Sequence, residues 1–143
     1  MNVRRFEDWP SRLDSFLESR RATPFSYGSH DCCLFAADAV LAITGVDPAA
    51  SFRNRYKSAF GAMRRMREVC ADATVWATAR DVFGDLHLPE IDPLFAQRGD
   101  VVLVSHSAGE SLAVIAPDGW PVAPDDVGWK RSDRAYALTA WRI

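Results

Sequence analysis

The segment 32–44 restricts the fold more than any other feature of the sequence, because it is apolar on nearly every side. Asp31 precedes it as a candidate N-cap, and Gly45 follows it as a candidate left-handed C-cap. A helix that is apolar all round is usually buried, so we expect this helix at the centre of the domain. Its apolar residues are Leu34, Phe35, Ala36, Ala37, Ala39, Val40, Leu41 and Ile43.

Three further segments with helical spacing of apolar residues are expected in the first part of the chain. Asp8 can cap the first of them, and Pro10 suits its first turn. Residues 85–97 carry two prolines and are expected to form an irregular connection. The three expected helices span residues 7–21, 56–70 and 73–83.

The pattern changes to short β-rich runs after residue 100, bounded by glycine, aspartate and proline. Helices followed by an antiparallel sheet predict an α+β fold. A length of 143 residues fits one domain, residues 1–143, with a single core. The expected strands are 101–104, 111–116 and 135–142, with 120–122 as a further candidate.

The charge and hydropathy of the chain exclude several function classes. A net charge of −2 and a pI near 5.9 give no overall attraction to nucleic acid, so no nucleic-acid partner is expected. No apolar run approaches the roughly 20 residues that span a bilayer, so no membrane insertion is expected. The start of the chain lacks a signal-peptide pattern, which predicts a protein made in the cytoplasm without export by the ordinary route.

Cys32 is the candidate nucleophile, because it falls in the first turn of the expected central helix. Unpaired backbone donors and the positive end of the helix dipole favour a thiolate there. A thiol so placed can titrate well below its free pKa of roughly 8.5. Asp31, directly before it, is expected to point its carboxylate at backbone amides as the N-cap. Gly28 would let the backbone bend tightly into the site.

The other two cysteines fit structural positions, and the residues around Cys32 lack the pattern of a metal site. Cys33 and Cys70 fit buried packing positions, and three cysteines make a poor disulfide framework, so reduced thiols are expected. His30, Cys32 and Cys33 lie close together, but no second ligand pair has suitable spacing for zinc. Neither a metal nor a cofactor is therefore predicted.

Two motifs carry a resemblance to a known family. The stretch Tyr27-Gly-Ser-His-Asp-Cys32 before an apolar helix resembles the nucleophile motif of NlpC-type peptidoglycan peptidases. Gly99-Asp100, opening an expected strand, resembles the second signature of that family. The resemblance implies a papain-like fold, in which a central helix bearing Cys32 packs on a small antiparallel sheet and Cys32 is the nucleophile.

From about Trp9 to Ile143 the chain also resembles a small protein family of phage and prophage tail gene clusters. This resemblance implies a virion component, made in the host cytoplasm and placed in the tail, with other tail proteins as partners. The segments that carry it are Phe35–Val40, Thr44–Pro48, Arg98–Asp100, Ala123–Asp125 and Ala140–Arg142.

The sequence departs from the peptidase pattern where the general base is expected. In NlpC-type peptidases a histidine begins the strand that corresponds here to residues 111–115, and neither Ser111 nor Leu112 is a histidine. His106, in an expected loop 105–110, and His30, two residues before the nucleophile, are the candidate substitutes. His87 is expected on the surface. Loss of a positioned acid–base group typically costs about 10²–10⁴ in rate.

Three functions fit these features. The favoured hypothesis is a tail component, for the tail tip or its assembly, that keeps an NlpC-like fold with a degraded active site. The alternative is an active cysteine hydrolase that cuts peptidoglycan stem peptides during phage entry, with Cys32 as nucleophile and His106 or His30 as base. The third is an intracellular amidase or thiol-dependent transferase unrelated to phage. The candidate catalytic residues are Cys32, His30, His106 and Asp31.

Overall fold

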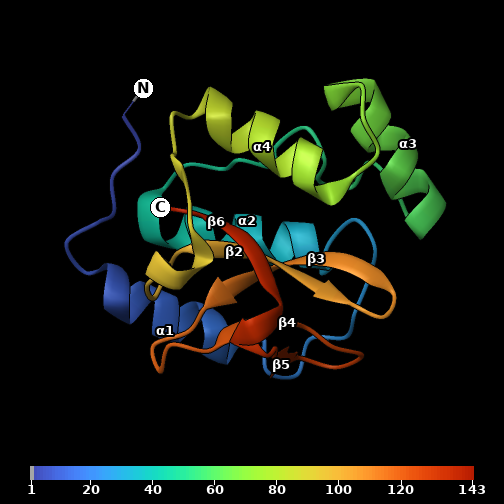
Figure 1. Cartoon of the computed structure of the whole chain (residues 1–143). Coiled ribbons are helices and arrows are strands. Elements are labelled where there is room, and N and C mark those ends of the chain that lie inside the picture. Colours follow the sequence, from blue (N-terminus) through green and yellow to red (C-terminus); the bar gives the residue numbers. More distant parts are fainter. Residues whose placement is uncertain (1) are drawn as a thin grey trace.

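The computed structural model describes residues 2–143 and has the α+β architecture that the sequence predicted. Within these residues, four helices accompany a six-stranded antiparallel sheet of order β1-β6-β2-β3-β4-β5 (Figure 1). The helices are α1 (Trp9–Ser19), α2 (Cys32–Thr44), α3 (Ala59–Cys70) and α4 (Val75–Asp85), and short 3₁₀ turns are η1 (Pro93–Phe95) and η2 (Arg134–Tyr136). The strands are β1 (Glu90–Ile91), β2 (Val101–His106), β3 (Gly109–Ile115), β4 (Pro121–Pro124), β5 (Trp129–Arg131) and β6 (Ala137–Trp141).

Helix α2 lies at the centre of the molecule, as its apolar sequence predicted. It packs against β3 and β4, with α1 beside it, while α4 packs on β3 and carries α3 at the edge (Figure 1). Both predicted caps are confirmed. The Asp31 carboxylate accepts the N–H of Leu34, and Gly45 ends the helix with φ 77°. The apolar surface of α2 therefore sets where the N-terminus of this helix, and with it Cys32, must lie.

The two faces of the sheet bury separate apolar clusters. The face toward α2 includes Val101, Leu103 and Leu112, which join the main core with α1 and α4. The opposite face includes Val102 and Val104, beneath the segments that contain η1 and η2. Successive side chains of β2 point to opposite faces of the sheet, and both faces are covered by a core. This explains why the strand is apolar at nearly every position.

Several expected element boundaries were wrong. Helix α1 is shorter than 7–21, and Asp8 occupies the N-cap position without capping, because its carboxylate pairs with Arg12 one turn along. Helix α3 starts at Ala59 rather than 56, since Ser58 is the residue that caps it. The expected irregular connection 85–97 contains β1 and η1.

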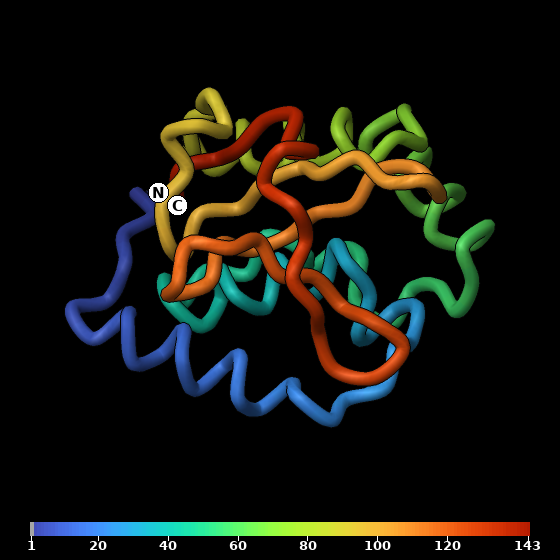
Figure 2. Tube along the Cα trace, turned by 60° about the horizontal axis from the view of Figure 1, so that its bottom comes forward, coloured from blue at the N-terminus to red at the C-terminus, as the bar shows by residue number. Residues whose placement is uncertain are grey.

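The two ends of the described chain lie side by side (Figure 2). The Arg5 guanidinium donates to the Ile143 carbonyl at 2.7 Å and to the fully buried Asp100 carboxylate at 2.8 Å. Asp100 also accepts from Arg142 and from the Ile143 N–H. The Gly-Asp signature that opens β2 is therefore a clamp that joins both chain ends to the sheet.

No helix among residues 2–143 combines the length and apolar character that crossing a bilayer requires.

Candidate active site

Cys32 is the first residue of α2, and its half-buried thiol lies beside β3. Its pKa is lowered from the ordinary thiol value, chiefly because the Cys33 thiol, with its sulfur 3.9 Å away, donates a hydrogen bond. Burial and the Asp31 charge raise the pKa, while the Leu112 N–H and the Ser111 hydroxyl lower it further. The pKa of Cys33 is raised because it keeps the proton of the pair, and burial adds to this effect. Cys32 is therefore the thiol of this pair that ionises first.

Asp31 holds the turn that presents Cys32. One carboxylate oxygen accepts the Leu34 N–H at 3.0 Å, and the other accepts the Gly28 N–H at 2.9 Å and the Tyr56 hydroxyl at 2.7 Å. Burial and the Asp31 charge raise the pKa of Tyr56, so its hydroxyl remains a donor. With its oxygens occupied in this way, the carboxylate positions the turn and is not free to accept a proton from Cys32.

Gly28 permits the close approach of this turn to the segment that carries Tyr56. Its φ is +88°, and a Cβ built there would lie 2.2 Å from the Tyr56 carbonyl oxygen. Any side chain would therefore separate Tyr56 from Asp31. The expected role of Gly28 in a tight bend is confirmed.

Ser111 and Leu112 occupy the place where the resemblance expects a catalytic histidine, and both contribute to the pKa of Cys32. The β2–β3 hairpin sets this arrangement, because Val104 pairs with Ser111 and Leu103 with Leu112. Strand β3 packs against α2, and it carries serine and leucine where the resemblance expects a histidine.

His106 lies next to this position. It is the last residue of β2 rather than part of a loop 105–110, because the turn between β2 and β3 is tight and His106 pairs with Gly109. Its Nε2 lies 2.6 Å from the Ser111 Oγ, and its Nδ1 accepts the Ala108 N–H at 3.2 Å. The imidazole of His106 is therefore in contact with Ser111, whose hydroxyl also contributes to lowering the pKa of Cys32.

His30 is buried within the turn 27–31 that precedes Cys32, and its ring nitrogens lie near other groups than the Cys32 sulfur. Its Nδ1 lies 3.5 Å from the Arg20 guanidinium, and its Nε2 lies 3.3 Å from the Gly128 carbonyl oxygen. Because Arg20 only donates, Nδ1 is the acceptor and Nε2 carries the hydrogen. The ring also stands edge-on to Phe35. His30 therefore joins α1 and the 125–128 loop to the turn. His87 is exposed at the end of α4, as expected.

Of the candidates from the sequence, the structure places Asp31 and Cys32 in one turn and His106 against Ser111, a residue that the sequence did not single out as a candidate. The contact between His106 and Ser111 follows from the pairing of β2 with β3, which places the two residues on one face of the hairpin as diagonal neighbours. Among residues 2–143, no group of three or more histidine, cysteine, aspartate or glutamate side chains is arranged to hold a metal ion.

A family model described as a domain of unknown function, DUF6950, matches residues 4–143. The chain belongs to this family. The DUF6950 match includes the nucleophile turn, α2, the β2–β3 hairpin and the clamp around Asp100, so the candidate site lies wholly inside the family domain. No curated protein matches the chain.

Proposed function

We propose that the protein is a papain-like, NlpC-type cysteine hydrolase that cleaves an amide bond, with Cys32 as nucleophile. The observation that carries this proposal is the contact between His106 and Ser111, a residue that also contributes to the lowered pKa of Cys32. The thiol has a lowered pKa, a hydroxyl beside it contributes to that lowering, and an imidazole lies 2.6 Å from the hydroxyl. These are the groups that a thiol nucleophile and its proton donor require.

The contacts of His106 support the following proton positions. In the resting arrangement the Ala108 N–H makes Nδ1 of His106 an acceptor, so Nε2 carries the hydrogen and donates to Ser111. The Ser111 hydroxyl is then free to donate to the Cys32 thiolate. When Nδ1 takes a proton from solvent, the ring becomes an imidazolium and gives up the bond from Ala108. His106 is exposed, so solvent reaches it.

The reaction then follows in two steps, acylation of Cys32 and hydrolysis of the thioester. The Cys32 thiolate attacks the carbonyl carbon, a C–S bond forms, and the C–N bond breaks. The leaving amine takes the Ser111 proton, and His106 replaces that proton through Nε2. Water then hydrolyses the thioester and releases the acid. The backbone N–H of Leu112 contributes to lowering the pKa of Cys32, and so favours the thiolate before attack. The resemblance to NlpC-type peptidases favours the amide bonds of peptidoglycan stem peptides as substrates.

Alkylation at controlled pH tests the nucleophile. At neutral pH, iodoacetamide is expected to modify Cys32 faster than Cys33 or Cys70. The pKa of Cys32 is lowered, whereas the pKa of Cys33 is raised by its hydrogen bond to Cys32 and by burial, and that of Cys70 by burial and nearby carboxylates. A lowered pKa keeps the thiolate populated as pH falls below the ordinary value of about 8.5, so the rate declines only at lower pH. Peptide mass spectrometry over a pH series measures each cysteine separately.

The Cys33→Ala variant sharpens this test. It removes the largest cause of the lowered pKa, so the Cys32 labelling profile is expected to move to higher pH. Cys70→Ala is the matched control, since Cys70 lies at the end of α3 and does not contribute to the Cys32 pKa. Labelling of Cys32 that requires as high a pH as labelling of Cys70 would count against the nucleophile.

A second candidate function is a structural component of a phage or prophage tail. Four exposed apolar side chains on η1, η2 and β6 favour it, because neighbouring exposed apolar residues mark protein contacts. The Arg134 guanidinium, which donates to the Pro93 and Ala96 carbonyl oxygens, holds the two turns together. The four residues are Leu94, Phe95, Tyr136 and Leu138.

The double variant Leu94→Ser with Phe95→Ser is expected to leave the protein folded while removing it from tails assembled from the full set of tail proteins. These residues are 81% and 68% exposed, so the change costs little packing within the domain. Val127→Ser, on a different surface and 62% exposed, is the matched control. Purified tails analysed by immunoblot give the answer. Tails that never contain even the unaltered protein would exclude this function.

A further inference from the structure

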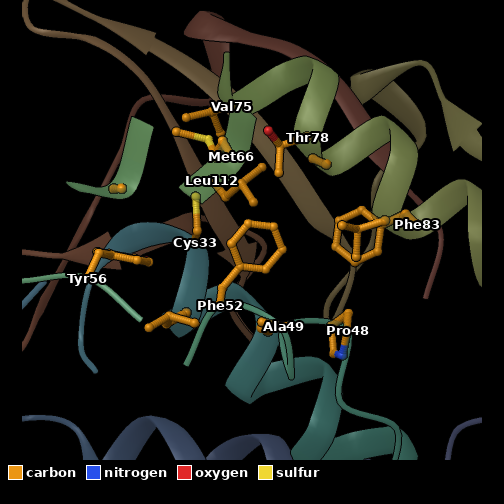
Figure 3. Close-up of a pocket in the computed structure, with 15 residues that line it drawn as sticks. Cys33, Pro48, Ala49, Phe52, Tyr56, Met66, Val75, Thr78, Phe83 and Leu112 are labelled. Carbon is orange, nitrogen blue, oxygen red and sulfur yellow. The ribbon is translucent and has the colours of Figure 1, made fainter. Parts of the chain in front are cut away.

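An apolar cavity of about 70 Å³ lies beneath the candidate active site, between α2, α3, α4 and β3. Figure 3 shows side chains from α2, the 48–56 segment and β3 converging on it, with the Cys33 sulfur directed toward Leu112. A cavity of about 10–15 Å³ already holds one water-sized group, so this one has room for several non-hydrogen atoms. Its lining consists of Cys33, Leu34, Ala37, Pro48, Ala49, Phe52, Tyr56, Ala62, Met66, Val75, Thr78, Ala79, Val82, Phe83 and Leu112.

The cavity offers almost no hydrogen-bonding capacity to an occupant. The Thr78 hydroxyl donates to the Thr74 carbonyl at 2.8 Å, and the Tyr56 hydroxyl donates to Asp31 at 2.7 Å. The Cys33 thiol is engaged with the sulfur of Cys32. A polar occupant would lose its hydrogen bonds to water without replacement, whereas an aliphatic group would gain by leaving water.

The cavity adjoins the nucleophile. Cys33, in its wall, has its sulfur 3.9 Å from that of Cys32. Leu112 lines the same wall, and its backbone N–H contributes to lowering the pKa of Cys32. A group attached to the carbonyl carbon of a Cys32 thioester therefore starts at the edge of the cavity.

The α3 wall is the least firmly held. Met66 is the residue that α3 buries, and Phe60, at 70% exposure, turns away from the core on the same helix. Ala62 reaches the cavity from this helix and is partly buried. A helix anchored by so little buried surface can shift to admit an occupant at low cost.

We infer that this cavity is an acyl subsite, which takes a short aliphatic group on the carbonyl side of the bond that Cys32 attacks. The inference rests on the proposed function for the choice of nucleophile, and on the cavity for the choice of substrate. According to this inference, the cavity between α2 and α3 selects the acyl group of the substrate. It does so by the length of the aliphatic chain and not by charge.

A series of p-nitrophenyl esters tests the subsite in the full chain. The Cys32 thiolate attacks the ester carbonyl, a C–S bond forms, the C–O bond breaks and p-nitrophenolate leaves. The acylation rate is expected to rise roughly fourfold with each methylene from acetate to hexanoate, since each buried methylene contributes about 0.8 kcal/mol. It is then expected to fall for decanoate, whose chain exceeds the cavity. Absorbance gives the rate, and mass spectrometry locates the acyl group.

A larger side chain in the cavity wall can be compared with the same substitution outside the cavity. Ala62→Leu is expected to reduce the ratio of hexanoate to acetate rates to within about twofold of one, because the added methyl groups occupy the space of the chain. Ala59→Leu makes the same change at an exposed position of α3 outside the cavity, and is expected to keep the unaltered ratio. The ester series in the unaltered protein remains decisive if Ala62→Leu does not fold.

The outcomes separate the two proposals. Acylation of Cys32 at rates independent of chain length overturns the subsite and leaves the nucleophile standing. A chain-length preference that Ala62→Leu leaves intact also overturns the subsite. Failure of every ester to acylate Cys32 faster than Cys70 overturns both. A preference for hexanoate that Ala62→Leu removes and Ala59→Leu preserves supports the subsite.

Discussion

Cleavage of hexanoyl p-nitroanilide is expected to fall to the uncatalysed background in the Cys32→Ala variant, and by about 10²–10⁴ in the His106→Gln variant. The first change removes the nucleophile. The second removes the group that returns a proton to Ser111, whose Oγ lies 2.6 Å from the His106 Nε2. The release of p-nitroaniline, followed by absorbance, measures both rates under the same conditions.

The leaving group distinguishes a proton donor from a residue that only supports the hairpin. A p-nitrophenolate leaves without a proton, whereas the nitrogen of an anilide must be protonated as the C–N bond breaks. The His106→Gln variant is therefore expected to lose much more activity on the anilide than on the p-nitrophenyl ester of the same acid. A variant that lost both activities equally would place His106 in a structural role.

His87→Gln is the matched control for His106→Gln. His87 is exposed at the end of α4, so this variant is expected to keep both activities. His30→Gln answers a different question. His30 joins Arg20 and the Gly128 carbonyl, so its replacement is expected to act on stability and not on the ratio of anilide to ester rates.

The arrangement of Cys32, Ser111 and His106 changes the balance between the functions that the sequence left open. The absence of histidine at Ser111 favoured a degraded site as long as His106 was expected in a loop. The hairpin register brings that histidine to the serine instead. Our proposal of an active hydrolase therefore rests on a pairing between strands, while the tail context still rests on sequence resemblance and the exposed apolar residues.

Local signals predicted the centre of the fold well. The apolar surface of α2, its Asp31 cap and its Gly45 end all depend on residues adjacent in sequence, and each was confirmed. The nucleophile turn was predictable for the same reason, because Gly28 and Asp31 lie within the same short segment as Cys32.

Features that depend on distant partners were not predictable. Strands β1 and β5 are only 2 and 3 residues long, and each exists because a longer strand, β6 or β4, provides hydrogen bonds along its edge. The Tyr56 bond to Asp31 spans 25 residues of sequence, and the His30 bond to Gly128 spans 98. The prediction that Asp8 caps α1 was wrong, because its carboxylate pairs with Arg12 instead of with a backbone N–H.

Replacement of Asp100 is expected to have the largest effect on the stability of the fold. The carboxylate is fully buried and binds Arg5 at 2.8 Å and Arg142 at 2.9 Å, while the N–H groups of Gln97 and Ile143 donate to the same two oxygens. It therefore joins the segment before α1, the start of β2 and the end of the chain. An amide of the same shape keeps part of this geometry, but it removes the charge and presents an N–H₂ group toward donors that need an acceptor.

The Asp100→Asn variant is expected to lose about 3 kcal/mol of unfolding free energy, the lower end for breaking a buried ion pair, because Arg142 is partly exposed. For a domain of this size that corresponds to a fall in Tm of roughly 10 °C. Asp118→Asn breaks an ion pair with Arg131 in which both side chains are substantially exposed, and is expected to cost less than about 1 kcal/mol. Thermal and urea unfolding of the two variants compare a buried clamp with a surface pair. Equal losses would show that the Asp100 clamp contributes no more than a surface contact, and that the apolar packing of β2 and β6 alone holds the chain ends to the sheet.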